Sequence, residues 1–192
     1  FCTYLAVIPA AIFCFLPTKQ YMKWSSRSVI LAFSILYILL VPAGVCLGFF
    51  FHLDDNITVG IMIIIFFIGY NHLLTTRFSQ NLNMFCLCIA LMAFCSNFAR
   101  GFDALLHPYA PAGSFSLEAC LFQFGCSFLL VLLLGWPVAH FGSRLIHSLK
   151  ADAPWYAMSL VSCTFFILNI FIIPHNYQVL YSYRVFTVFW QI

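Results

Sequence analysis

The chain is a succession of long apolar runs separated by short polar connections. A helix of about 20 apolar residues crosses the roughly 30 Å hydrocarbon core of a bilayer and satisfies its own backbone hydrogen bonds there. The runs are continuous and lack the two-residue alternation of barrel strands. The pattern therefore predicts about seven membrane-spanning helices, the first and last incomplete, near residues 1–16, 28–51, 57–74, 82–98, 118–138, 155–173 and 177–192.

Composition supports the same class of protein. Of the 192 residues, 64% are hydrophobic and 7% are charged, against roughly 45–50% and about 25% in an ordinary soluble domain. The mean hydropathy is +1.03, and a soluble fold could not bury this much apolar surface. Residues 1–192 are therefore predicted to form one all-α, polytopic transmembrane helical bundle whose first partner is the lipid bilayer. The basic residues form no cluster, so we expect no nucleic-acid binding.

Basic residues are distributed unevenly between the connections. The connections after the first, third and fifth predicted segments hold six of the eight: Lys19, Lys23, Arg27, Arg77, Arg144 and Lys150. The opposite connections hold Arg100 and Arg184, with four of the five acidic residues. Because Lys and Arg are retained on the cytoplasmic side during insertion, this distribution predicts an integral membrane protein with its N-terminus outside. It also predicts that the last segment leads any following sequence into the cytoplasm.

The sequence lacks the motifs that identify common catalytic sites. It has no G-x-S-x-G elbow, no H-E-x-x-H pair, no phosphate-binding loop and no Cys-x-x-Cys pair. Cys86 and Cys88 point about 200° apart on a helix, so packing explains them better than metal binding. We therefore expect no catalytic residue, metal or cofactor in this chain. Acids are absent from the interiors of the apolar runs, which disfavours proton-coupled transport, while a small-molecule transporter or channel is kept as the alternative.

Gly44 and Gly48 form a G-x-x-x-G motif, which allows helices to pack closely in lipid. In a chain with several spans, this motif more often seats a neighbouring helix of the same protein than a dimer partner.

Polar residues gather near the predicted outer ends of the segments. Tyr177, Tyr181 and Arg184 follow i, i+4, i+7 spacing and so share one helix face. One interpretation is an outward-facing pocket in which arginine and tyrosine bind a ligand. The other is an interfacial aromatic belt with an arginine extended toward the headgroups. The candidate ligand-binding residues are Asn97, Arg100, Asp103, Glu118, Asn169, Tyr177, Tyr181 and Arg184.

Three stretches carry a resemblance to a known family. They are NFARGFDALLHPYAP after the fourth predicted segment, LLLGWPV in the fifth, and a tail in which Trp155 is followed by N-x-F-I-I-P and N-Y-x-x-L-Y-x-x-R-V-F. With the predicted orientation, they resemble the membrane input region of bacterial GHKL-type sensor histidine kinases.

The resemblance implies a receptor of the bacterial cytoplasmic membrane that senses a membrane state or an extracellular ligand such as a peptide. It also implies a homodimer in the full-length protein, and a helix displacement that is passed to a cytoplasmic kinase domain acting on a response regulator. That domain would follow Ile192, so kinase activity is implied for the parent protein and not for these residues.

Overall fold

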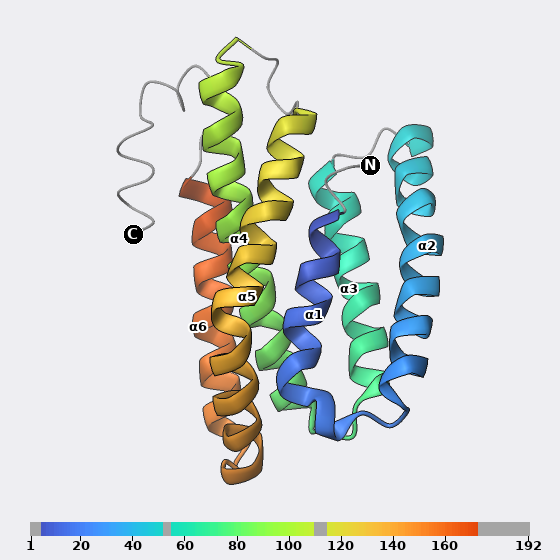
Figure 1. The fold of residues 1–192 in the computed structure, drawn as a ribbon, viewed down its shortest axis with the longest axis vertical. Helices are drawn as coiled ribbons and strands as arrows, with labels where there is room; N and C mark the ends of the chain where they lie inside the picture. Colours follow the sequence, from blue (N-terminus) through green and yellow to red (C-terminus); the bar gives the residue numbers. More distant parts are fainter. Residues whose placement is uncertain (1–4, 52–54, 110–114, 173–192) are drawn as a thin grey trace.

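The computed structural model describes residues 5–51, 55–109 and 115–172, and most of these residues lie in helices (Figure 1). An isolated bridge joins Met22 and Leu74. The helices are α1 (Val7–Thr18), the 3-10 turn η2 (Lys19–Tyr21), α2 (Ser26–Phe51), α3 (Asp55–Leu73), α4 (Phe78–Leu106), α5 (Leu117–Ser148) and α6 (Ala153–Ile172). The predicted segment at 177–192 lies outside the described residues.

The predicted helical class is confirmed, whereas the number of seven membrane spans stays a prediction. Among the described residues, three helices are long and apolar enough to cross a membrane: Ser26–Phe50, Phe78–Leu106 and Leu117–Ser148. α3 contributes a shorter apolar stretch, Gly60–Leu73. The chain is therefore an all-helical protein with the character of an integral membrane protein.

Two helices extend well beyond the ends of the predicted membrane segments, because hydropathy marks the apolar part of a helix and not the whole helix. α4 continues to Leu106, past the predicted end at residue 98, so Arg100 and Asp103 are helical and do not lie in an extended connection. α5 runs through Pro137 to Ser148, past the predicted end at residue 138. The start of α5 agrees with expectation, since the Ser116 side chain accepts a hydrogen bond from the Ala119 backbone N–H at 3.1 Å.

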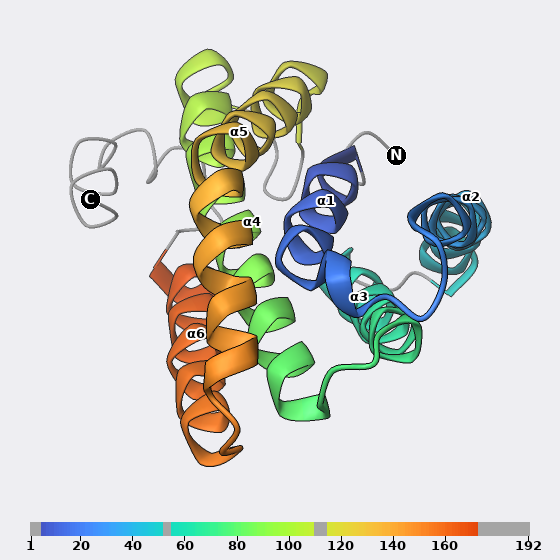
Figure 2. The ribbon, with the colours of Figure 1, turned by 60° about the horizontal axis from the view of Figure 1, so that its bottom comes forward.

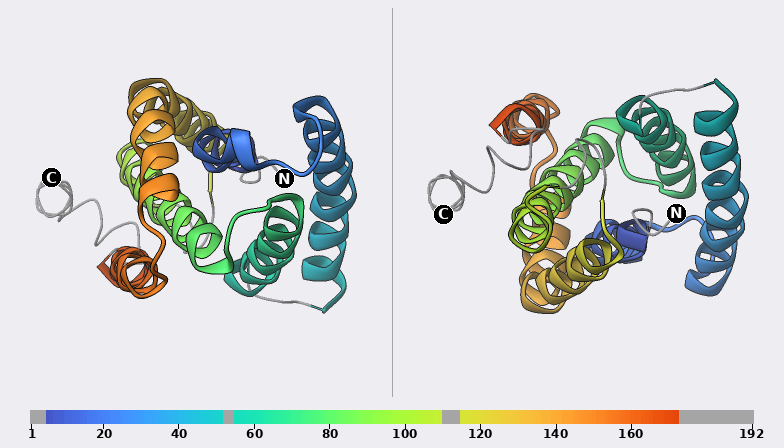
Figure 3. Two further views of the ribbon diagram at one scale, coloured as in Figure 1. Left: turned by 90° about the horizontal axis from the view of Figure 1, so that it is seen from below. Right: turned by 90° about the horizontal axis from the view of Figure 1, so that it is seen from above.

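α4 is the central helix of the bundle. It contacts α1, α3, α5 and α6, whereas α2 lies at the edge and packs mainly against α3 (Figures 2 and 3). One core cluster joins α1, α3, α4 and α5 through Phe13, Cys14, Tyr70, Leu74, Cys88 and Val131. The helices at the edge are thus held by the helices that surround α4.

The basic connections meet at one end of the bundle, the lower end in Figure 1. The Thr75 backbone N–H donates to the Tyr21 carbonyl at 2.8 Å, and the Lys23 ammonium donates to the His72 carbonyl at 2.8 Å. Arg77 donates to the Lys150 carbonyl. The connections that follow α1, α3 and α5 therefore form one continuous hydrogen-bonded layer.

Two glycine positions set how closely helices approach. A Cβ at Gly44 would lie 2.0 Å from the terminal methyl of Met62, so the G-x-x-x-G motif seats α3 of the same chain. A Cβ at Gly142 would lie 2.8 Å from Cβ of Pro17, where α5 crosses α1. Proline is rigid, so Gly142 is the position at which a methyl group cannot be accommodated by a change of side-chain rotamer.

We expect Gly142→Ala to lower the free energy of unfolding by about 1–3 kcal/mol, because the added methyl overpacks the contact between α5 and α1. Gly125→Ala is the matched control on the same helix, since a Cβ there meets no atom within 4 Å. The control should be neutral or should stabilise the protein by about 0.5–1 kcal/mol through helix propensity. Thermal unfolding of both variants in detergent checks this difference, and equal melting temperatures would contradict the packing of α1 on α5.

Candidate functional site

The candidate site lies at the upper end of the bundle in Figure 1, where α4 and α6 end and α5 begins. Two of its residues meet directly. The Asn97 side-chain amide donates to the side-chain oxygen of Asn169 at 2.7 Å and to its backbone carbonyl at 3.1 Å. Asn169 in turn donates to the Phe165 carbonyl at 2.8 Å. Asn97 and Asn169 are 8% and 4% exposed, so this pair is a buried polar junction between α4 and α6.

Asp103 connects α4 to the start of α5. Its carboxylate accepts a hydrogen bond from the Ser116 backbone N–H at 3.1 Å, and the residue is 1% exposed. The first backbone N–H groups of a helix have no partner within the helix and carry a partial positive charge, so a carboxylate is favourable there. Asp103 therefore fixes the entry into α5 across the connection that follows α4.

The remaining charged groups of this end are more accessible. Glu118 lies in the first turn of α5 and faces His107, with 4.0 Å between the carboxylate oxygen and Nε2. Both side chains are exposed, so this contact contributes little stability by itself. Arg100 is partly buried and forms no ion pair with a carboxylate of the described residues. This end of the bundle thus offers one partly buried arginine and one exposed carboxylate to a polar ligand.

The eight predicted residues therefore divide into three groups. Asn97 and Asn169 are brought together, and Asp103 lies on the neighbouring helix junction. Arg100 and Glu118 lie on the accessible part of the same end. Tyr177, Tyr181 and Arg184 lie outside the described residues, so their predicted role stays a prediction.

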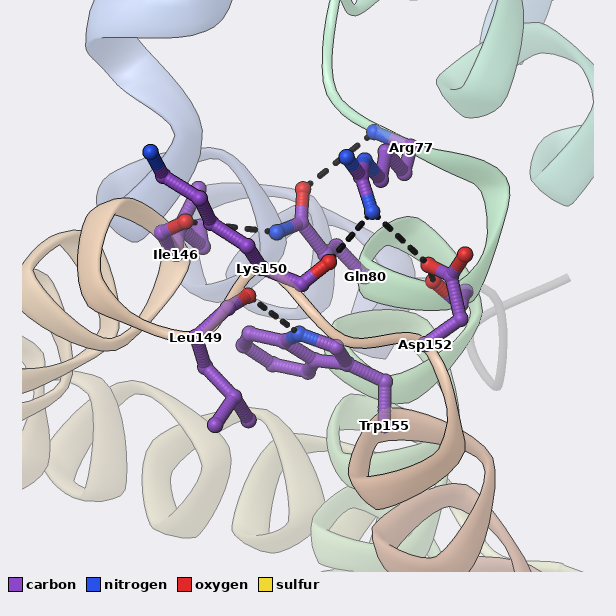
Figure 4. A network of polar contacts seen from close by, with 8 residues as sticks. Arg77, Gln80, Ile146, Leu149, Lys150, Asp152 and Trp155 are labelled. Atoms are coloured by element: carbon purple, nitrogen blue, oxygen red, sulfur yellow. Dashed lines mark hydrogen bonds and ion pairs between the residues drawn. The ribbon is translucent and has the colours of Figure 1, made fainter.

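Sequence reasoning missed a polar network at the opposite end (Figure 4). Asp152 lies 3.6 Å from the Arg77 guanidinium and accepts a hydrogen bond from the Ser79 hydroxyl at 2.6 Å. The Gln80 amide donates to the Ile146 carbonyl at 3.3 Å, and Trp155 donates to the Leu149 carbonyl at 3.1 Å. The network holds the start of α4 against the turn between α5 and α6. Asp152 could have signalled it, because it is the one acid on the basic side of the predicted topology.

The cysteines and histidines give no sign of a metal centre within 5–51, 55–109 and 115–172, where no group of three or more His, Cys, Asp or Glu residues could hold an ion. The thiols of Cys86 and Cys163 lie 3.4 Å apart and join α4 to α6. These residues act there as small groups at a helix interface.

Comparison with known proteins leaves the family open, because no family model, no curated protein and no solved structure matches this chain. A functional conclusion therefore depends on the residues and their arrangement.

We expect the Asn97 and Asn169 side chains to be energetically coupled. In a double-mutant cycle of Asn97→Ala, Asn169→Ala and the double variant, the coupling free energy should be about 0.6–1.7 kcal/mol, the range of interhelical hydrogen bonds in membrane proteins. Unfolding in detergent measures each of the four proteins. Strictly additive effects would show that the two amides do not interact, and Thr164→Ala, which removes a bond within α6 alone, serves as the control.

Proposed function

We propose that this chain is the membrane-embedded input domain of a two-component sensor histidine kinase. It senses an extracellular or membrane signal and relays it to a cytoplasmic kinase module of the full-length protein. The ligand, of which a peptide is one class, binds at the outer ends of α4, α5 and α6. The full-length protein is a homodimer in the bacterial cytoplasmic membrane, and its kinase module phosphorylates a response regulator.

The observation that carries this proposal is the buried junction between Asn97 and Asn169. It lies close to the end of α6, the helix that precedes residues 173–192 in the sequence. A hydrogen-bonded pair in an apolar interface has one favoured arrangement, and losing it leaves buried polar groups without partners. A ligand that changes the position of α4 or α5 at this end therefore changes the position of α6.

The proposed roles follow from accessibility. Arg100 and Glu118 contact the ligand, because they are the charged predicted residues of this end that retain exposed surface. Asp103 positions α5, and Asn97 with Asn169 transmits the change to α6. Tyr177, Tyr181 and Arg184, which lie outside the described residues, are proposed as further ligand-binding residues.

A small-molecule transporter or channel is the second candidate, and one observation favours it. Asn83 and Gln123 are buried on α4 and α5, and their side-chain oxygens accept no hydrogen bond from the described residues. Such groups can line a polar pathway. The charged residues argue in the other direction, since the described carboxylates lie in the connections or within the first or last turn or so of their helices.

The orientation can be tested by cysteine labelling in a background without native cysteines. Ser25→Cys lies in the connection between α1 and α2, and Tyr109→Cys lies at the opposite end with 85% of its surface exposed. An impermeant maleimide added to intact cells should label position 109 and should label position 25 only after permeabilisation. Labelling of position 25 on intact cells would contradict the orientation and with it the proposed outer site.

The signalling role can be tested with the full-length protein in nanodiscs, by measuring ATP-dependent autophosphorylation with and without culture medium that contains the signal. Asn169→Ala should reduce the signal-dependent change by roughly 3- to 15-fold, which corresponds to the loss of one interhelical hydrogen bond. Arg184→Ala should reduce the response without lowering the melting temperature.

Thr164→Ala is the matched control, because Thr164 is exposed on α6 and bonds only within its own helix. An equal loss of response in this control would contradict the relay through Asn169. A reading frame that continues beyond Ile192 into further apolar segments without an ATP-binding domain would contradict the kinase assignment itself.

A further inference from the structure

A groove runs between α1 and α2 at the edge of the bundle, with a volume of about 690 Å³. This lies within the roughly 300–1,000 Å³ of sites for small organic ligands. Phe15 and Phe33 line the groove and form an edge-to-face pair with ring centroids 5.4 Å apart. They rest on α3, where Phe15 contacts Tyr70 and Phe33 contacts Phe66. The walls are largely apolar, with Ile8, Ala11 and Ile12 from α1 and Ile30 and Ile38 from α2.

Among the described residues that line the groove, Lys19 is the charged one, and it lies at one end. Lys19 and Ser26 line the end at which the basic connections meet, while Ser34 and Tyr37 add hydroxyl groups farther along α2. Arg27 does not line the groove itself, but it follows Ser26 directly, is exposed, and lies seven residues before Ser34 on nearly the same helix face. The apolar groove therefore ends in a positively charged mouth, formed by Lys19 and Ser26 with Arg27 beside them.

The length of the groove corresponds to one leaflet of a bilayer. Along α2 it extends from Ser26 to Ile38, which at about 1.5 Å per residue is roughly 18 Å. Half of a hydrocarbon core of about 30 Å is about 15 Å, and the remaining few ångströms reach the headgroup region. A molecule with its charged group at the mouth would thus place its apolar part within a single leaflet.

The charge at the mouth is not neutralised by the protein. Neither Lys19 nor Arg27 forms an ion pair with a carboxylate in the part of the chain that the structure describes. Lys23, nearby, donates to the His72 carbonyl, which leaves its charge uncompensated. Asp152, the acid described at this end, is engaged by Arg77 on the far side of the bundle. The mouth therefore attracts an anion.

We propose that the groove binds one anionic phospholipid. Its phosphate lies at Lys19, Arg27 and Ser26, and one acyl chain lies between α1 and α2 as far as Ile38. Basic pockets between transmembrane helices recognise anionic headgroups in this way. The site is at the opposite end from the junction of Asn97 and Asn169, so it does not depend on the proposed signalling function.

The test uses the full chain purified in an uncharged detergent, with native mass spectrometry and thermal unfolding as readouts. Phosphatidylglycerol and phosphatidylcholine with identical acyl chains are added separately. Phosphatidylglycerol should be retained at one molecule per chain and should raise the melting temperature, whereas phosphatidylcholine should do neither. Equal effects of the two lipids would overturn the proposal, because they would indicate general solvation by lipid.

The headgroup contact is tested by Lys19→Gln and Arg27→Gln, singly and together. Each should weaken binding of phosphatidylglycerol roughly fivefold, the usual contribution of one basic residue beside an anionic lipid. Arg144→Gln is the matched control, because Arg144 is an exposed arginine at the same end of the bundle but on α5, which contributes no residue to the groove lining. An equal loss in this control would overturn a specific site.

The acyl-chain contact is tested by Ile30→Trp and Leu31→Trp. The two residues are adjacent on α2 and are 66% and 65% exposed, but only Ile30 lines the groove. Ile30→Trp should abolish retention of the lipid while Leu31→Trp retains it, and both should keep the helical circular dichroism of the parent chain. Equal retention would overturn the proposal, as would a chain dimer that Ile30→Trp dissociates, because a second copy would then occupy the groove.

Discussion

The structure depends on one constraint: several polar side chains of α4 are buried in an apolar bundle, where a hydrogen-bond partner on another segment offsets the cost of burial. Ser79 bonds to Asp152 in the connection before α6, and Gln80 bonds to the Ile146 carbonyl of α5. Asn81 donates to Asn71 of α3 at 2.8 Å, and Asn97 donates to Asn169 of α6. Between helices in lipid, apolar contact alone gives little preference for one neighbour over another. These directed bonds therefore select which helices surround α4 and in which register.

The class of the fold could be predicted from the sequence because continuous apolar runs have few other physical solutions. The order of the helices around α4 could not, since a face that contacts lipid and a face that contacts protein are both apolar. The mean hydropathy of α4 is the lowest of the three helices long enough to span. The first turns of α4 are polar and contain Ser79, Gln80, Asn81 and Asn83. These polar residues are the feature of the sequence that indicates a central position for α4. Hydropathy assigns that stretch to a connection, so the predicted membrane segment begins four residues after the helix does.

The residues of the candidate site were predicted to lie at a similar depth in the membrane. The positions of apolar runs along the sequence contain information of this kind. Pairing is a different kind of information. Asn97 and Asn169 are 72 positions apart, and only the packing of α4 on α6 brings their amides within 2.7 Å. The same holds for Arg77 and Asp152, which the sequence places on one side of the membrane without indicating that they meet. Contacts between residues on distant segments therefore cannot be predicted from the order of residues along the chain alone.

The connection between the edge of the bundle and its centre passes through α3. α2 packs mainly against α3, and the rings of Phe33 and Phe66 lie 5.3 Å apart there. Tyr70, one turn farther along α3, donates to the Cys14 carbonyl of α1 at 3.2 Å, and Asn71 accepts the bond from Asn81 of α4. A molecule held between α1 and α2 thus acts on the same helix that anchors the start of α4. Because α4 also carries Asn97 nearer its other end, this helix links the side of the bundle that holds the groove to the junction of Asn97 and Asn169.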